Sequence, residues 1–480
     1  MDVENTRGVI AQTYHELQAI GVLERSRQAY PLNLASPEIA LRAIFQCAEV
    51  SLLNLEDLIR RATNDIAADN VDGAVIKLSW ARGFHRVMVR LSALPYELGD
   101  QVVDTNATHS LSINQSPAYK KFLAAMQSIE AAVEHRIESG QLDLEKVIAE
   151  ESLESTSFRI LHLLRLMFHE HSIWLENLAH VSIPVPVPSH EEFVVTDLME
   201  AAVYDTTLKG DTYFTQFRGL HQVPETLGFE INDRMEVAIR ALQAGELSLA
   251  IEQMHSINTL STGILESLPV IADNLSTADY HEIRENLGLT SGSHSVCFHY
   301  HMFRDLYEQL AESVNDYLGR NYKQGADEFS LEDTLREAAG KRFENSKDFQ
   351  VHMLITECLR FRMFTRNWRN LHLHLPRNNL GGEHTKSLTG SKDAISAVRG
   401  MFNSAKRRDP FTAHAHARSA GRANGLATAD QESGNAMPEL DKKILDTTGG
   451  ITKRRFQAVQ DRTGVFATSC PFSTPPKRSA

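Results

Sequence analysis

Three short segments in the second half of the chain carry side chains that could do chemistry together. The first contains His221, the second contains Arg284 ahead of a small polar loop at 290–295, and the third ends at His372. Imidazoles are common ligands of metal cofactors, and a guanidinium binds a carboxylate through two hydrogen bonds. Their order and spacing indicate a helical pocket with two facing imidazoles, a carboxylate-binding arginine and a glycine-containing loop. A haem protein that acts on an amino acid needs this set of groups.

His372 follows a helical pattern at 349–369 that is rich in aromatic and basic residues. A b-type haem needs one protein imidazole on its iron, apolar walls for the porphyrin and cationic groups for the propionates. This stretch supplies all three residue types. Two alternatives stay open: His372 as a buried histidine at a helix end, and His374 as a competing ligand that points to another face of the helix.

His221 and Glu225 stand four residues apart and share a face if a helix already runs there. Pro224 predicts instead that a helix begins near this point, with proline in its first turn. A zinc site is not indicated, because the segment has neither an HExxH motif nor a second His or Cys at metal spacing. His221 is therefore either an imidazole above an iron-bound dioxygen or a hydrogen-bonded histidine at a helix start.

The second segment has the composition of a helix start, with Ser276 or Thr277 as the N-cap. The helix that follows places Tyr280 and Arg284 on one face. A phenol beside a planar guanidinium suits an α-carboxylate. The polar loop at 290–295 allows close backbone approach to a flat ligand, the alternative being an ordinary turn between helices.

The elements that must position these groups are predicted to be almost entirely helical. Apolar residues recur at helical spacing in the runs 39–61, 74–94, 118–138, 156–180, 192–203, 229–243, 247–268, 296–318, 332–343 and 347–370. The best strand-like segment, 181–188, carries three prolines and is predicted to be an extended linker rather than part of a sheet. The expected fold class is all-α.

The two halves of the chain share a pattern that predicts an internal duplication, the alternative being chance similarity among amphipathic helices. The segment around Gln46 recurs 176 residues later around Gln222, and the helix that contains Trp174 resembles the one that contains Trp368. The first copy has Phe45 in place of His221, and roughly Leu178 in place of His372. We therefore expect the first lobe to lack haem ligands and to be structural.

These patterns predict four parts. They are an N-terminal helical lobe at 1–180, a Pro-rich linker at 181–194, a haem domain at 195–404 and a tail at 405–480. The tail has 13 Lys and Arg against 7 Asp and Glu, is rich in small and polar residues, and lacks helical periodicity. Most of it is expected to be disordered, with a basic docking arm as the alternative.

Composition and charge set the broad class. With 42% hydrophobic and 23% charged residues, the 480-residue chain has the make-up of a soluble globular protein. A net charge of −13 argues against a nucleic-acid partner, because such binding depends on neutralising phosphates. The N-terminus has no apolar leader, and no apolar stretch approaches membrane-spanning length. The four cysteines lack CxxC or CxxCH spacing, so we expect a cytoplasmic protein without membrane partners or covalently attached haem.

With these residues in view, the second half resembles tryptophan 2,3-dioxygenase and its superfamily of histidine-ligated haem proteins. This superfamily includes indoleamine 2,3-dioxygenase and the enzyme that rearranges chlorotryptophan in pyrrolnitrin biosynthesis. The family's His-Gln-x-x-Glu-Leu segment is similar to 221–227, and its Thr-Pro-x-Asp-Tyr-x-x-Phe-Arg stretch to 276–287. Its Ser-Gly-Phe-Gln-Ser loop corresponds to 291–295 and its Trp-Arg-x-x-His motif to 368–372, within a match that spans 211–403.

The resemblance implies roles for particular residues. His372 would be the proximal ligand of a haem b iron, and His221 the distal histidine. Arg284 would bind the substrate carboxylate, while Phe217 and Tyr280 would line the substrate pocket. These implications agree with the chemistry that the residue types indicate by themselves.

The resemblance also implies contacts from loops. Ser291 and Gly292 would lie close to haem and substrate, and Trp368 would contact the cofactor. Thr389, or alternatively Thr385, would bind the substrate ammonium from the Gly- and Thr-rich loop that follows the third segment.

Two departures from the family pattern affect the substrate. Ser293 and His294 replace the family's Phe-Gln, and the segment 387–391 replaces its Gly-Thr-Gly-Gly loop. The expected function is a haem-dependent oxygenase that uses O2 on tryptophan or a related aromatic amino acid. Dioxygenation of the indole ring is the family reaction; rearrangement, hydroxylation and mono-oxygenation are the alternatives. The oligomeric state stays open, because the lobe duplication could replace subunit pairing.

Two rival functions are a haem-binding sensor or carrier without catalysis, and a helical scaffold protein. The presence of Arg284 argues against a carrier, because gas binding requires no carboxylate clamp.

Overall fold

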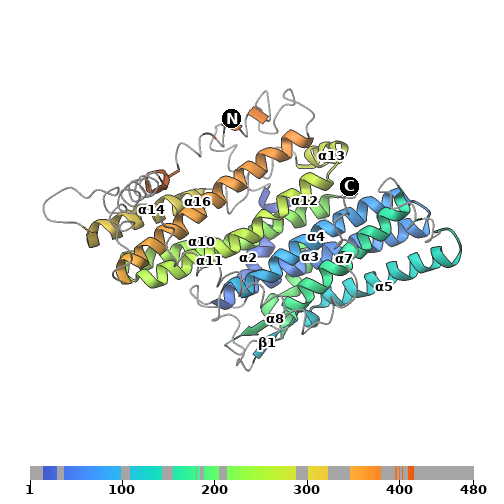
Figure 1. Ribbon diagram of the computed structural model, residues 1–480, viewed down its shortest axis with the longest axis horizontal. Coiled ribbons are helices and arrows are strands. Elements are labelled where there is room, and N and C mark those ends of the chain that lie inside the picture. The colour runs from blue at the N-terminus through green and yellow to red at the C-terminus, as the bar shows by residue number, and fades with distance from the viewer. Residues whose placement is uncertain are drawn as a thin grey trace, which may run out of the picture. The chain divides into compact units, whose positions relative to one another are not determined.

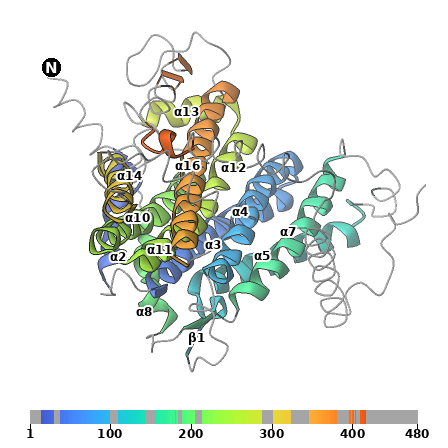
Figure 2. The same cartoon turned by 60° about the vertical axis from the view of Figure 1, so that its left-hand side comes forward.

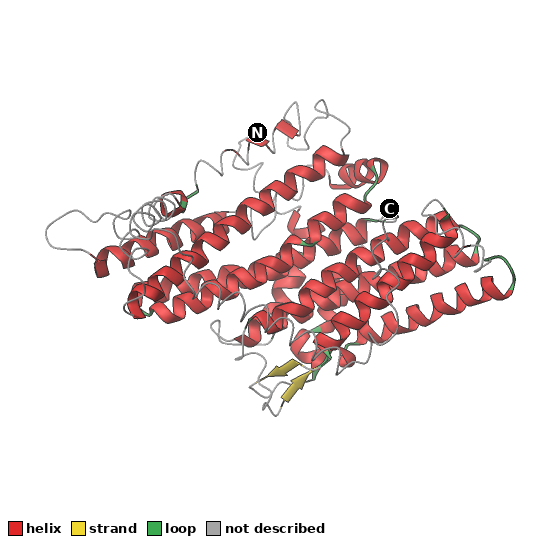
Figure 3. Cartoon of the chain, in the orientation of Figure 1, coloured by secondary structure: helices red, strands yellow, loops and turns green. Residues whose placement is uncertain are grey.

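Helices make up nearly all of the described part of the chain, so the all-α prediction is confirmed (Figure 3). The computed structural model describes residues 14–29, 37–98, 109–142, 155–179, 181–183, 189–204, 213–287, 301–322, 346–379 and 409–415, with a few isolated positions. They all belong to one compact unit, Met1–Ser419. Among these residues, no helix is both long enough and apolar enough to cross a membrane.

The helices lie close to the predicted runs, with some differences at their ends. Their bounds are α2 Ile20–Gln28, α3 Pro37–Ala67, α4 Val71–Glu97, α5 Pro117–Glu138, α7 Thr156–Leu178, α8 His190–Val194, α9 Thr196–Tyr204, α10 Phe214–Ala244, α11 Leu247–Leu265, α12 Ser267–Asn274, α13 Thr277–Leu287, α14 His301–Tyr322 and α16 Ser346–Asn379. The run predicted at 192–203 is two helices, because Val195 adopts a left-handed conformation with φ of 59°. The run at 332–343 lies outside the described residues.

Helix ends follow local sequence signals. Ser116 caps α5 through its side chain, and Pro117 occupies the first helical turn. Ser276 accepts a hydrogen bond from the backbone N–H of Asp279 at 3.1 Å, so it is the N-cap of α13. Gly245 ends α10 with a φ of 83°, a conformation that glycine adopts without strain.

The prediction of an extended linker was wrong for the first three residues of the proline-rich segment, which belong to a sheet. Val181–Ile183 forms β2, which pairs antiparallel with β1, His109–Leu111. These three residues precede the first proline, Pro184, so their backbone N–H groups are free to pair. The remainder of the segment, 184–188, lies outside the described residues.

The long helices pack in two groups that repeat one arrangement (Figures 1 and 2). In the first lobe, α3 packs on α4 and α5, and α4 packs on α7. In the second lobe, α10 packs on α11 and α14, and α11 packs on α16. The lobes meet where α3 packs on α10 and where α4 packs on α11 and α12. The same packing order in both lobes is what an internal duplication produces.

The centre of the interface between the lobes relates residues at the repeat spacing. The thiol of Cys47 in α3 lies 3.6 Å from the carbonyl oxygen of Val223 in α10, and these two residues are 176 positions apart. Equivalent positions of the two copies thus touch each other, as they do at a two-fold axis. The repeat spacing of the sequence therefore also relates the residues that join the lobes.

The segment that precedes each lobe packs on the other lobe. Tyr14 donates from its hydroxyl to Oε1 of Glu225 in α10 at 2.9 Å. His190, at the start of α8, has Nε2 3.0 Å from Oε1 of Glu49 in α3. Tyr14 and His190 are separated by the repeat spacing, as are Glu49 and Glu225. We call the two leading segments, 14–28 and 190–204, the arms; each arm crosses to the opposite lobe.

Two buried glutamines donate hydrogen bonds to backbone carbonyls of the arms. Gln222 donates from Nε2 to the carbonyl oxygen of Gln18 at 3.1 Å. Gln46 donates from Nε2 to the carbonyl oxygen of Val194 at the same distance. The two glutamines that align in the sequence repeat therefore hold the two arms in the same way.

Buried arginines one turn earlier on each helix bind the C-terminal end of the arm that belongs to their own lobe. Arg42 donates from Nη2 to the carbonyl oxygen of Arg27 at 2.7 Å, and Arg218 donates to that of Val203. Both guanidiniums are almost completely buried, so leaving either without its acceptor would be costly. Each lobe therefore binds its own arm through an arginine and the arm of the other lobe through a glutamine.

Buried histidines make the stability of the fold sensitive to acid. Burial lowers the pKa of four imidazoles, to about 3 for His85 and to about 4 for His171, His221 and His414. The unfolded chain takes up these protons near pH 6.5, whereas the folded chain resists until about pH 3 to 4. The stabilisation is therefore complete above pH 6.5 and declines as the pH falls from 6.5 towards 4.

We expect His85→Gln to flatten this decline. The amide oxygen of glutamine can accept the hydrogen bond that Trp174 gives to His85 Nδ1, but it does not titrate. Urea unfolding between pH 7 and pH 4 measures the effect. His374→Gln, at an exposed site, is the matched control, and equal slopes for both variants would contradict the prediction.

Candidate functional site

The helix that carries His221 is continuous, which corrects the prediction that a helix begins at Pro224. α10 starts ten residues earlier, at Phe214, and Pro224 lies inside it. Proline has no N–H, so the bond to the carbonyl of Leu220 is missing within the helix. Because the helix already runs through 221–225, His221 and Glu225 do share one face.

His221 is held as a neutral imidazole in one tautomer. Its Nδ1 lies 2.8 Å from the carbonyl oxygen of Phe217, an acceptor, so Nδ1 carries the proton. Burial lowers the pKa of His221 to about 4, although the bond to Phe217 opposes this. The Phe217 ring packs beside the imidazole at a centroid distance of 4.3 Å. Nε2 therefore carries a lone pair at neutral pH.

Trp368 and His372 stand one turn apart on α16 and are 5% and 9% exposed. α16 continues to Asn379, so His372 lies within the helix rather than at its end. His374, the competing ligand, is exposed and is not among the pocket-lining residues described next. This arrangement favours His372 over His374 as the ligand.

One pocket brings the two candidate histidines together. It is partly open to solvent, and its walls are Tyr14, His221, Pro224, Glu225, Leu268, Trp368 and His372. These residues come from the first arm, α10, α12 and α16. Three residues singled out in the sequence, from segments that are distant along the chain, therefore line one space.

Sequence reasoning missed the contribution of the arm to this pocket. Tyr14 reaches it from the opposite end of the chain and binds Glu225 within it. The position of Glu225, one turn after His221, was a visible signal for its place on the pocket face. Tyr14 gave no such signal, because no local pattern relates it to α10.

Two of the arginines on α16 form ion pairs with carboxylates. Arg362 donates from Nε to Oδ2 of Asp409 at 2.7 Å, and Arg360 pairs with Glu357 at 3.0 Å. Phe411, in the same short segment as Asp409, is completely buried. The start of the predicted tail is therefore docked on the helix that carries His372, and Arg362 serves this docking.

The other predicted site residues are not placed in the pocket. Tyr280 is half-buried on α13 and does not belong to the pocket walls. Arg284 lies on the same helix, but its side chain is outside the described residues. Ser291, Gly292 and Thr389 are also outside the described residues, as are Thr385, Ser293 and His294, so their predicted roles stay predictions.

The equivalent positions of the first lobe carry a mixture of apolar and polar side chains. Phe45 stands where the second lobe has His221, and its ring meets that of His190 edge to face at 5.6 Å. Phe45, Trp174 and Leu178 are completely buried. His190 and Glu49, the equivalents of Tyr14 and Glu225, are hydrogen-bonded to each other and buried.

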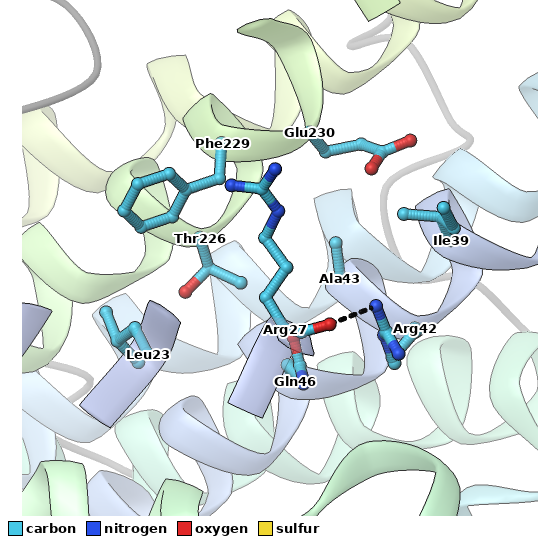
Figure 4. A pocket seen from close by; sticks show the side chains of 9 residues that line it. All are labelled: Leu23, Arg27, Ile39, Arg42, Ala43, Gln46, Thr226, Phe229 and Glu230. Carbon is cyan, nitrogen blue, oxygen red and sulfur yellow. Dashed lines mark hydrogen bonds between the residues drawn. The ribbon is translucent and has the colours of Figure 1, made fainter. Parts of the chain in front are cut away.

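A second pocket, with an empty volume of about 290 Å³, lies where α2 meets α3 and α10 (Figure 4). Its walls are Leu23, Arg27, Ile39, Arg42, Ala43, Gln46, Thr226, Phe229 and Glu230. Arg27 pairs with Asp233 at 2.6 Å and lies over the ring of Phe229. Arg42 binds the first arm at the carbonyl of Arg27 and Gln46 binds the second arm at the carbonyl of Val194, so these polar groups have a structural role in holding the arms.

Comparisons with known proteins give no family for this chain. No protein-family model matches it, and no curated protein matches it. In the described part of the chain, no group of three or more His, Cys, Asp or Glu side chains could hold a metal ion. A haem makes a different demand, because the porphyrin supplies four nitrogen ligands and the protein needs to supply only one imidazole.

The chemistry of the pocket fits a haem. His372 supplies one nearly buried imidazole to the pocket walls, and one protein imidazole is what a haem iron needs. Pro224, Leu268 and Trp368 provide apolar walls beside His372. The space lined by the seven described residues is smaller than a porphyrin, so a haem held by His372 would extend beyond these walls.

Proposed function

We propose that the protein is a haem-dependent oxygenase of tryptophan or a related aromatic amino acid, acting in the cytoplasm. The observation that carries the proposal is the meeting of His221, Trp368 and His372 in one pocket. These residues belong to motifs that lie about 150 residues apart in the chain, on α10 and on α16. Ordinary core residues from such distant motifs would have no reason to line the same space.

His372 would hold the iron of haem b, and Trp368, one turn earlier, would pack against the macrocycle. When bound, the haem supplies the activation of dioxygen. The protein contributes binding, orientation and exclusion of water. The nearly complete burial of the pocket residues serves that last task.

His221 would orient the substrate. Its Nδ1 proton is committed to the carbonyl of Phe217, so Nε2 can accept a hydrogen bond but cannot donate one. An indole N–H is a donor that matches this acceptor. Arg284 would bind the α-carboxylate, with Phe217 and Tyr280 against the ring, so that the substrate is fixed at both ends.

Reconstitution with haem tests the proposal directly. The full chain is expected to give a Soret band with one equivalent of haem b and then to consume tryptophan only when dioxygen is present. Absence of a Soret band would exclude both haem functions. A Soret band without loss of any aromatic amino acid would identify a carrier or sensor instead.

Arg284→Ala should separate substrate binding from haem binding. Loss of a bidentate carboxylate contact should weaken amino-acid binding by at least about tenfold, equivalent to 1.4 kcal/mol, without loss of haem. Spectral titration of the reconstituted protein with the amino acid measures this. Arg304→Ala, on an exposed part of α14, is the control. Equal affinities for the two variants would remove Arg284 from the site.

A further inference from the structure

The core of the first lobe contains two oxidisable side chains, each hydrogen-bonded to its own imidazole. The hydroxyl of Tyr119 in α5 lies 3.2 Å from Nε2 of His171 in α7. The indole N–H of Trp174 in α7 donates to Nδ1 of His85 in α4 at 3.0 Å. A phenol or indole that loses an electron becomes a strong acid, and here each has a base in place to take its proton.

The two units touch each other. The rings of Tyr119 and Trp174 meet edge to face with centroids 5.8 Å apart, and the His171 ring lies 4.7 Å from that of Trp174. An electron can therefore pass between the two aromatic side chains without crossing a gap. Phe122, also completely buried, packs against both rings.

Burial determines what form an oxidised ring can take here. Tyr119 is 4% exposed, and Trp174 and His85 are completely buried. Loss of the proton moves the positive charge from the oxidised ring to an imidazole, and the half-buried His171 is a better place for that charge than the completely buried His85. Burial lowers the pKa of both imidazoles, so both are neutral at pH 7, and His171, with a pKa of about 4, is a stronger base than His85, with a pKa of about 3.

The second lobe has the same helix packing as the first but does not repeat this cluster of Tyr119, Trp174 and their imidazoles. Trp368 of the second lobe aligns with Trp174, and the residue three positions before it is Thr365 rather than a histidine. The hydroxyl of Thr365 donates to the backbone carbonyl of Arg362. The hydrogen-bonded imidazoles are thus a property of the first lobe, the one without the candidate haem ligands.

We infer that Tyr119 and Trp174 form a one-electron oxidation site that accepts an oxidising equivalent and holds it as a neutral tyrosyl radical. Trp174 gives one electron to a one-electron oxidant, such as a trivalent metal complex, and its N–H proton moves to His85. Tyr119 then returns an electron to Trp174, whose nitrogen regains the proton. The O–H bond of Tyr119 breaks, and its proton moves to Nε2 of His171.

The inference does not depend on the proposed oxygenase activity, because the oxidant is supplied from outside. The full chain is irradiated with tris(bipyridine)ruthenium(II) and a sacrificial electron acceptor, frozen, and examined by electron paramagnetic resonance. We expect a neutral tyrosyl signal that is lost, for the most part, in Tyr119→Phe. The phenylalanine keeps the ring packing, which circular dichroism checks.

Tyr96→Phe is the matched control. Tyr96 is 47% exposed and donates to the backbone carbonyl of Asn177, which cannot take up a proton. If the oxidant instead reacted with exposed tyrosines, the tyrosyl signal would be lost in Tyr96→Phe and kept in Tyr119→Phe. That result would overturn the inference. A second variant, His171→Asn, tests the proton acceptor. It should lower the yield of the Tyr119 radical, and an unchanged yield that also does not depend on D2O would overturn the role of His171.

Discussion

Replacement of His372 by alanine is expected to abolish retention of haem. His372 lines the pocket together with His221, and the described chain offers no other α16 imidazole in its walls. Loss of even an outer-shell partner weakens metal binding by about 10–100-fold, so loss of the ligand itself should exceed 100-fold. Titration of the apoprotein with haem b, followed at the Soret band, measures the change in Kd.

His374→Ala is the control for this experiment, because His374 lies on the same helix and is exposed. It should bind haem as the unmodified chain does. If haem binding fails in His374→Ala and survives in His372→Ala, the assignment of the ligand is reversed. If both variants bind haem equally well, neither histidine on α16 is the ligand.

Replacement of Gly83 by alanine is expected to destabilise the protein by about 1–3 kcal/mol, as overpacking of a close helix contact does. A Cβ atom at Gly83 in α4 would lie 2.3 Å from Cγ1 of Val270 in α12. In an open helix the same change would stabilise by about 0.5–1 kcal/mol, so the expected sign is set by the tertiary contact. Urea unfolding at pH 7.5 measures the difference.

The double variant with Val270→Ala tests the cause. Removing the valine methyl groups makes room for the new Cβ, so the two substitutions together should cost less than the sum of their separate effects. Strict additivity would show that the contact between α4 and α12 is not the reason. Because Leu268, two residues before Val270, lines the pocket, haem binding should weaken together with stability in Gly83→Ala.

The positions of the helices could be predicted from the sequence better than the residues at which they begin and end. Apolar spacing of 3.6 residues is a property of one helix, so runs such as 74–94 and 118–138 could be predicted without a structure. The start of α10 could not, because Pro224 is a strong local signal for a helix start. The tertiary packing of this buried helix overrides that signal.

The candidate site was predicted in part for a similar reason. His221, Trp368 and His372 belong to motifs whose residue types indicate chemistry, and they do line one pocket. Tyr14 and Leu268 have common residue types and no motif. Tyr14 joins the site only because the first arm crosses to the second lobe and bonds to a residue 211 positions away.

The sequence by itself determined that the chain is helical, and it predicted a relation between its halves at a spacing of 176 and a pair of candidate imidazoles. Only the tertiary structure decided that the arms are exchanged and that Trp174 bonds to His85. The physical reason is that periodicity and motifs are properties of neighbouring residues. The pairing of a buried polar group is instead settled by which distant segment reaches it, since such a group must find a partner when water is excluded.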